Sequence, residues 1–253
     1  EDYPVLFELD RLRATSRDET PAPVPTFDCV VLDEAQELSP LELALIGRAV
    51  APGGTIVVAG DAAQQVDPAA AFTGWDATLA ALGPRDFLRA RLTVNHRCPP
   101  DVTRLARQVA GLEAGPVVPV THITRETLPS ALHLTAWVAD ALDHITTEDP
   151  QASVAVLCRT REAALALYPA LHAALDVRLA LDGRFELRPG VSLTAVEEVK
   201  GLEFDDVIVA DADARSWPDE PGSRRALYVA LTRATRRLVL AAERGFSPLL
   251  EDG

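Results

Sequence analysis

Two adjacent acids, Asp33 and Glu34, directly follow the apolar run FDCVVL at residues 27–32. A second apolar run, TIVVAGD at residues 55–61, also ends in an acid, Asp61. Ligands of parallel sheets bind outside the carboxyl ends of the strands. Because carboxylate oxygens suit Mg²⁺, which bridges to substrate phosphates, these acids could hold the ion and position a water. The alternative is that Asp33 and Glu34 only begin a solvated loop.

The order of apolar runs predicts alternating strands and helices. Strands are expected at residues 27–32, 55–61, 89–97, 132–138, 153–160, 191–196, 205–212 and 236–242. Helices are expected at residues 5–14, 39–50, 99–111, 139–148, 161–175 and 223–235. The continuous apolar character of residues 27–32 suits a strand covered on both faces. Strands alternating with helices indicate an α/β fold, with parallel sheets that carry helices on both faces.

The chain of 253 residues is strongly acidic, with a formal net charge of −14. Such a chain is a poor generic binder of phosphate backbones. The basic residues are unevenly placed, because seven arginines lie between residues 215 and 244: Arg215, Arg224, Arg225, Arg233, Arg236, Arg237 and Arg244. This cluster could face a phosphate, or it could face the acidic remainder of the protein.

The three cysteines, Cys29, Cys98 and Cys158, are far apart and form no CxxC or Cys/His cluster. This spacing argues against a zinc site or a disulfide framework and favours a reducing, cytoplasmic location. The sequence has no apolar run of about 18 residues, so we expect no membrane span. The chain begins at Glu1 without a signal peptide and contains no Met, so we expect a fragment or a processed chain.

Five short motifs occur in a fixed order along the chain. They are LDEAQ (32–36), GDAAQQ (60–65), LTVNHRCP (92–99), VKGLEFDDV (199–207) and ALYVALTRA (226–234). Together they resemble motifs II to VI of the UvrD/Rep-like superfamily 1 helicases, over about residues 27–242. In the second motif, Gly60 is expected to let the backbone turn sharply.

The resemblance implies a RecA-like P-loop NTPase fold, with one partial and one complete RecA-like domain. Residues 1–26, which become polar and Pro-rich, are expected to be a linker. Residues 27–85 would then be the C-terminal part of the first RecA-like domain, and residues 86–253 the second. The implied cofactors are ATP and Mg²⁺.

The first two motifs imply the roles of five residues. Asp33 resembles the acid on the magnesium side of the Walker B element, and Glu34 resembles the general base that polarises the attacking water. Two carboxylates can divide these tasks because the ion neutralises one and leaves the other free to accept a proton. Gln36 resembles the residue that senses the attacking water or the γ-phosphate. Asp61 is a binding residue by this resemblance, and Gln64 would reach the γ-phosphate.

The later motifs imply the basic part of the site. Arg97, expected at the carboxyl end of the strand 89–97, and Arg233 resemble two arginine fingers, whose planar guanidinium groups neutralise charge on a transferring phosphoryl group. The alternatives are a surface ion pair for Arg97 and a solvated face of the helix 223–235 for Arg233. His96 stands where the family often stacks an aromatic on adenine. Gly201 and Glu203 belong to motif V, in which the acid resembles the one that binds the ribose hydroxyls.

The chain departs from the family pattern in one major respect. A Walker A loop needs GxxxxGK[ST], whose backbone amides and lysine hold the β- and γ-phosphates. The single lysine is Lys200, within VKGLEF, so the chain contains no such loop. Either it is the C-terminal part of a longer helicase-like protein or nucleotide chemistry has been lost. We expect truncation, because the predicted catalytic residues keep their chemical types.

The resemblance implies part of an ATP-dependent helicase or translocase that moves along single-stranded DNA. Aromatic residues make up 5% of the chain, which leaves few side chains to stack on bases. The compact spacing and the EVKGLEFD sequence resemble the helicase-like factor HelD as well. The alternative function is therefore an ATPase-fold switch that binds a protein partner such as RNA polymerase without unwinding.

Overall fold

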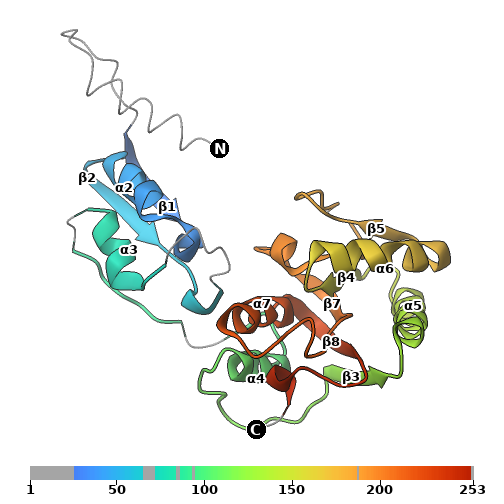
Figure 1. Ribbon diagram of the computed structural model, residues 1–253. Coiled ribbons are helices and arrows are strands. Elements are labelled where there is room, and N and C mark those ends of the chain that lie inside the picture. Colours follow the sequence, from blue (N-terminus) through green and yellow to red (C-terminus); the bar gives the residue numbers. More distant parts are fainter. Residues whose placement is uncertain (1–25, 65–71, 84–85, 93–94, 187, 252–253) are drawn as a thin grey trace. The chain divides into compact units, whose positions relative to one another are not determined.

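The computed structural model describes residues 26–64, 72–83, 86–92, 95–186 and 188–251 (Figure 1). The chain divides into two compact units, residues 1–91 and residues 92–253, which we call the N-terminal and C-terminal units. The expected domain boundary at 85/86 lies a few residues before this division. The expected helix 5–14 lies outside the described residues, as does the linker 1–26 apart from Thr26.

The N-terminal unit contains a two-stranded parallel sheet and short helices. Strand β1 (Phe27–Leu32) pairs with β2 (Val50–Val58), and helices α2 (Pro40–Arg48) and α3 (Trp75–Ala81) are joined to them through the 3₁₀ turns η1 (Ala35–Glu37) and η2 (Ala62–Gln64). Helix α2 begins with a capping box: the Ser39 hydroxyl accepts from the Glu42 amide, and the Glu42 carboxylate accepts from the Ser39 amide. This reciprocal cap satisfies two amides that the helix itself leaves open.

One face of this sheet is packed and the other is exposed. Leu32 of β1 joins Leu43, Ile46 and Leu82 in a small buried cluster against α2 and α3. On the opposite face, Val31 is 66% exposed. The expectation that strand 27–32 is covered on both faces is therefore wrong within the described part of the chain, because both helices described here pack on the same face.

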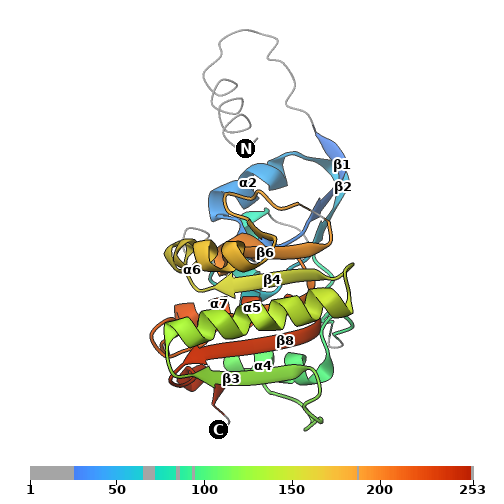
Figure 2. The same cartoon turned by 90° about the vertical axis from the view of Figure 1, so that its right-hand side faces the viewer.

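The C-terminal unit is built on a six-stranded sheet in which each strand pairs in parallel with its neighbours, in the order β3-β8-β7-β4-β6-β5. The strands are β3 (Ile123–Leu128), β4 (Ser153–Cys158), β5 (Val177–Leu179), β6 (Gly190–Ala195), β7 (Phe204–Val209) and β8 (Ala234–Glu243). The helices are α4 (Pro100–Val109), α5 (Ala131–Glu148), α6 (Arg161–Ala174) and α7 (Pro221–Leu231), with 3₁₀ turns η4 (Val196–Val199) and η5 (Pro248–Leu250). Helices α5 and α6 cover one face of the sheet, and α7 and α4 lie on the other (Figure 2). The α/β fold with a parallel sheet flanked by helices is confirmed.

The apolar run 132–138 is helical, and the strand expected there is wrong. It forms the first half of α5, which the Ser130 hydroxyl caps by accepting from the His133 amide. The buried residues Leu134, Val138 and Leu142 recur every four positions, which is the period of a helix face packed on the sheet. The run taken for a strand was therefore one face of a longer amphipathic helix.

Three further expectations about the elements change. The strand expected at 89–97 does not form in its described residues, 89–92 and 95–97. Strand β3 supplies the edge of the sheet instead, and neither β3 nor β5 was expected. The helix expected at 223–235 ends at Leu231 with Thr232 as its C-cap, so Arg233 lies in the connection to β8 rather than on a helix face.

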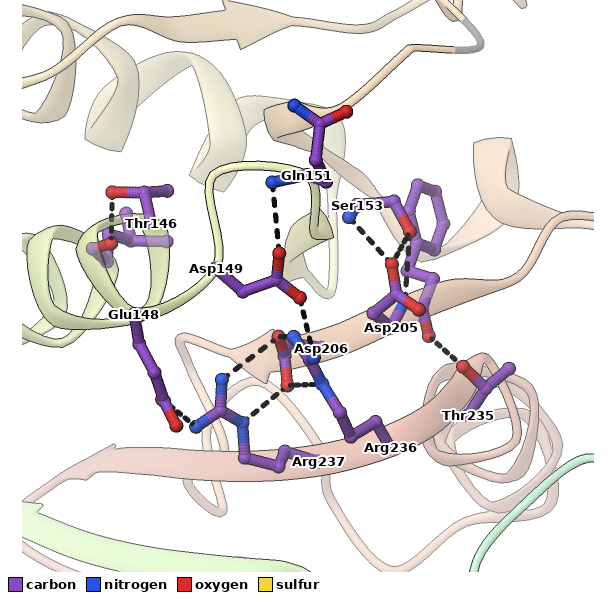
Figure 3. Close-up of polar contacts among 12 residues, drawn as sticks. Thr146, Glu148, Asp149, Gln151, Ser153, Asp205, Asp206, Thr235, Arg236 and Arg237 are labelled. Atoms are coloured by element: carbon purple, nitrogen blue, oxygen red, sulfur yellow. Dashed lines mark hydrogen bonds and ion pairs between the residues drawn. The ribbon is translucent and has the colours of Figure 1, made fainter.

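A buried carboxylate holds the first residues of β7 and β8 together (Figure 3). Asp206 is fully buried and accepts hydrogen bonds from Arg236 Nη2 at 2.6 Å and Arg237 Nε at 2.7 Å. Arg236 also donates to Asp149 and Arg237 to Glu148, at the end of α5. The hydrogen bonds to Asp206 raise the pKa of both guanidinium groups. The network therefore fixes two strands and a helix around one negative charge.

The network also answers what faces the arginine cluster. Arg236 and Arg237 bind acids of the protein itself, Arg224 pairs with Asp219, and Arg244 pairs with Glu243. For these four arginines the acidic remainder of the protein is the partner.

Replacing Asp206 by Asn, a change that keeps the shape and removes the charge, should destabilise the C-terminal unit by about 3 kcal/mol, because two arginines lose their shared buried partner. For a unit of this size that lowers the melting temperature by roughly 6–12 °C. Calorimetry and the hydrogen exchange of β7 and β8 amides measure it. The matched change Glu148→Gln removes an exposed partner and should leave the melting temperature close to the parent value; equal shifts for both variants would contradict the network's role.

Candidate functional site

The predicted acidic residues lie together at the carboxyl ends of β1 and β2. Backbone hydrogen bonds join the two ends: the Ala59 amide donates to the Leu32 carbonyl at 2.7 Å, and the Ala35 amide donates to the Ala59 carbonyl at 3.0 Å. Asp33 and Glu34 follow β1, and Asp61 follows β2. The N-terminal unit therefore brings the residues of the first two motifs to a single edge, as the parallel pairing requires.

Gln36 connects these two segments. Its side chain is fully buried, its Nε2 donates to Glu34 Oε2 at 2.5 Å, and its Oε1 accepts from the Asp61 amide at 3.1 Å. Asp61 in turn orders the following turn, since its carboxylate accepts from the Ala63 amide and from Gln64 Nε2 at 3.1 Å. Four predicted site residues are thus joined by side-chain hydrogen bonds.

Asp33 is exposed beside this network, and its Oδ1 accepts from the Glu34 amide at 2.9 Å. Glu34 has a left-handed backbone, with φ of 53°, which is uncommon for a residue other than glycine. The turn aims successive carboxylates differently, so Asp33 remains open while Glu34 is engaged. One open carboxylate together with waters and substrate phosphates is a donor set that suits Mg²⁺. Among the described residues no group of three or more His, Cys, Asp or Glu could hold a metal ion without such additional ligands.

Gly60 is required by close approach rather than by its backbone angles. Its φ is not among the positive values of the chain, so the sharp turn expected there is not the reason for glycine. A Cβ at this position would lie 2.2 Å from Gln36 Oε1 and 2.8 Å from the Trp75 ring. Such contacts are too short for real atoms, so Gly60 makes the space in which the Gln36 amide lies.

The predicted basic residues lie near the amino ends of β7 and β8 in the C-terminal unit. Arg97 Nε pairs with Glu203 Oε2 at 2.9 Å, and Glu203 immediately precedes β7. Arg233 immediately precedes β8. Arg97 was expected at the carboxyl end of a strand; it lies instead with residues at the amino ends of β7 and β8, because the strand 89–97 does not form. The pairing of β7 and β8 brings Glu203 near Arg233, because the Phe204 amide donates to the Arg233 carbonyl at 2.9 Å, and Arg97 joins them through its ion pair with Glu203.

Arg97 and Arg233 differ strongly in exposure. The Arg97 side chain is 49% exposed and its Glu203 partner 58%, so this contact is also a surface ion pair. Arg233 is 1% exposed, and its guanidinium donates to the carbonyls of Val229 and Leu202. Arg233 is therefore not on a solvated helix face.

Cys98 lies among these charged groups. Its Sγ donates to the Thr232 carbonyl at 3.3 Å. Burial raises the pKa of the Cys98 thiol, while Arg97 and Arg233 act to lower it and Glu203 to raise it. Cys98 is therefore next to Arg97 in the chain and is hydrogen-bonded to Thr232, which precedes Arg233.

The backbone around these residues is held by specific local features. Gly201 has φ of 72°, a conformation that glycine adopts at no steric cost. Asn95 Oδ1 accepts from the Arg97 and Cys98 amides at 2.8 and 3.1 Å. Sequence reasoning did not single out Asn95; the signal was an Asn shortly before the Pro-led start of a helix, a common side-chain turn. His96 is exposed.

A further acid was missed at the carboxyl ends of β4 and β7. Asp211 Oδ2 accepts from the Arg159 amide at 2.8 Å and its Oδ1 from Trp217 Nε1 at 3.2 Å. Trp217 is fully buried, and the Arg159 guanidinium lies 5.3 Å from its ring centre. Burial raises the pKa of Asp211 to about 6. The acid after an apolar run, at the end of DDVIVADA, was the available signal.

Comparisons with known proteins give the family resemblance independently. Residues 190–241 match the model of the UvrD-like helicase C-terminal domain. The structure resembles the C-terminal domain of a possible DNA helicase from Lactobacillus plantarum WCFS1, with 25% identity and a TM-score of 0.51, over 62% of this chain and 92% of that one. The resemblance to UvrD-like helicases is confirmed. No curated protein sequence matches the chain.

A second solved structure supports the fold alone. It is S. cerevisiae Dbp5 bound to RNA and ADP BeF3, with 14% identity and a TM-score of 0.51 over 93% of this chain. The chain spans 56% of that protein. The UvrD-like match and the resemblance to the Lactobacillus plantarum domain support a helicase-related role. No helix in the described part of the chain is long and apolar enough to cross a membrane.

Asp211 should make the stability of the C-terminal unit fall as pH rises from about 4 to 7. Its pKa is about 6 in the folded chain against an ordinary 3.8, so the folded state binds more protons in this range. In Asp211→Asn this contribution is absent, and the melting temperature of the variant minus that of the parent should rise with pH and level off above about 7.

The control for this pH series is Asp182→Asn. A hydrogen bond from Arg161 lowers the pKa of Asp182. Its stabilising contribution is therefore lost only as pH falls below about 5, and the melting-temperature difference between Asp182→Asn and the parent should be flat between about pH 5 and 7. A flat curve for Asp211→Asn as well would contradict the raised pKa.

Proposed function

We propose that this chain is part of an ATP-dependent superfamily 1 DNA helicase or translocase. The observation that carries the proposal is the hydrogen-bonded acidic edge of the N-terminal unit, in which Asp33 stays open while Gln36 holds Glu34 and Asp61. Bound Mg²⁺ would neutralise charge on the substrate phosphates. Asp33 would hold the ion, and Glu34 would accept the proton of the attacking water.

Arg97 is the arginine best placed to act on a phosphate. Its partner Glu203 is exposed, and exposed ion pairs contribute only about 0–1 kcal/mol, so exchange of Glu203 for a phosphate oxygen is inexpensive. The released Glu203 can then accept from the ribose hydroxyls. Arg233 would have to leave two backbone carbonyls, a loss of roughly 1–3 kcal/mol for each group left unsatisfied. His96 directly precedes Arg97, and Gly201 lies two residues before Glu203.

The proposed nucleic-acid substrate, along which the helicase would move, is single-stranded DNA. A second candidate function is an ATPase-fold switch that binds a protein such as RNA polymerase without unwinding. The pairing of Arg224, Arg236, Arg237 and Arg244 with acids of the chain favours this candidate, because it removes four cations from phosphate binding.

ATP turnover by the natural gene product that contains residues 1–253 should depend on Asp33, Glu34 and Arg97. Glu34→Gln should lower kcat about 10²–10⁴-fold, as for loss of a general base, and Arg97→Ala about 10³-fold or more, as for an arginine finger. The chain by itself, without a Walker A loop, should neither bind ATP tightly nor hydrolyse it. Steady-state turnover with a Gln108→Leu control tests this; Asp33-dependent turnover by residues 1–253 alone would contradict it.

Binding of the gene product to single-stranded DNA distinguishes the two candidates. A translocase should bind with an affinity that falls steeply as salt rises, because phosphate contacts release counterions. A protein-binding switch should show weak binding and little slope, and should co-purify with its partner. Fluorescence anisotropy of a labelled oligonucleotide between 50 and ~200 mM salt measures the slope.

A further inference from the structure

Among the described residues of the N-terminal unit, Gln36 is the only polar residue with 0% exposure. By family resemblance it was expected to sense the attacking water or the γ-phosphate. Both ends of its amide have a partner within the protein: Nε2 donates to Glu34 Oε2 at 2.5 Å, and Oε1 accepts from the Asp61 amide at 3.1 Å. Each end could make one further hydrogen bond, but the side chain is fully buried, so neither end faces the surface where a substrate would bind.

We propose that Gln36 is a positioning residue that holds the Glu34 carboxylate to the Asp61 backbone, and that it does not contact the nucleotide. The proposal rests on the proposed function only in the role of Glu34 as the base. Its geometric part, a rigid link between the segment after β1 and the segment after β2, stands on the distances alone.

The chemistry of the amide explains why glutamine is at position 36. Glutamine donates and accepts at the same time, and both are needed here, because one neighbour is a carboxylate and the other an N–H. Glutamate could accept from Asp61 but would place two carboxylates in contact. Leucine would leave the Asp61 amide without this acceptor, a cost typical of an unmade buried hydrogen bond.

Gly60 completes this arrangement. The space that a Cβ would take at Gly60 is occupied by Gln36 Oε1, at 2.2 Å from the ideal Cβ position. The absence of a side chain there lets the Asp61 amide reach the Gln36 oxygen. Gln36 and Gly60 therefore act as a pair, although they come from different strand ends.

The link couples the position of the base to the second motif. Asp61 also orders Gln64 through the 3.1 Å bond to its amide. A displacement of the Asp61 backbone would be passed to Glu34 through one side chain that has no room to rotate. The base is therefore aimed only when the segment 60–64 is in place.

Hydrogen exchange in the chain itself tests the geometry. In Gln36→Leu the Asp61 amide should exchange at least about fivefold faster, because it loses its acceptor. The same chemical change in the C-terminal unit, at the half-buried Gln108, should leave the exchange of the Asp61 amide unchanged. Unaltered exchange of Asp61 in Gln36→Leu would overturn the proposal.

A second variant guards against failure of Gln36→Leu to fold. Glu34→Asn keeps a residue that tolerates the left-handed backbone and removes the longer carboxylate. The side-chain amide protons of Gln36 should then exchange faster, while the Asp61 amide stays protected. Side-chain protons of Gln36 that already exchange freely in the parent would overturn the link.

A double-mutant cycle on ATP turnover by the natural gene product tests the role. Gln36→Leu should lower kcat by about tenfold or more with KM for ATP within about twofold, as expected when an interaction made only in the transition state is lost. In the Glu34→Gln background it should have no further effect, because residues that act as a unit are not additive. Full additivity, or a change confined to KM, would overturn the positioning role.

Gly60→Ala should reproduce the effect of Gln36→Leu on kcat, since its Cβ displaces the amide without changing its chemistry. The control is Gly222→Ala, where an added Cβ meets no described atom within 4 Å. Absence of turnover in the parent would overturn the proposed function, and the exchange of the Asp61 amide would then decide the structural link by itself.

Discussion

The buried Asp206 carboxylate is the interaction on which the C-terminal unit depends. It binds Arg236 and Arg237 of β8 from its own position in β7, and a charge removed from water needs such partners. Glu203 lies just before β7 and Arg233 just before β8, so the same contact that joins the strands also sets the spacing of these two residues. The pairing of β7 and β8, which Asp206 stabilises, therefore also positions these two site residues.

The two units present complementary chemistry from opposite kinds of strand end. The N-terminal unit carries acids after the carboxyl ends of β1 and β2, where exposed strand ends can bind a hydrated cation and phosphates. The C-terminal unit carries guanidinium groups before the amino ends of β7 and β8. Arg97 is available at the cost of a weak surface pair, whereas Arg233 is committed to backbone carbonyls. The two arginines therefore differ in the bonds that each must break before it can bind a phosphate, although their motifs suggest equal roles.

Local sequence patterns predicted much of the fold. The strand Phe27–Leu32 and the helices within residues 99–111 and 161–175 depend on patterns of neighbouring residues, and all three form as expected. The run 132–138 was taken for a strand because an apolar run alone does not distinguish a strand from one face of a helix. The short strand Val177–Leu179 gave no signal, since three residues are too few to show a period.

The sequence by itself determined the types and order of the site residues: acids after the first two apolar runs, arginines in the later motifs, and a single lysine. The tertiary structure alone decided which of their atoms remain available. Gln36 was expected to meet a substrate, but packing against Gly60 leaves its amide bound at both ends. Arg233 was expected to act on a transferring phosphoryl group, yet its guanidinium is buried and donates to two backbone carbonyls. Residue type is a property of the chain, whereas burial and hydrogen-bond partners depend on contacts between segments distant in sequence.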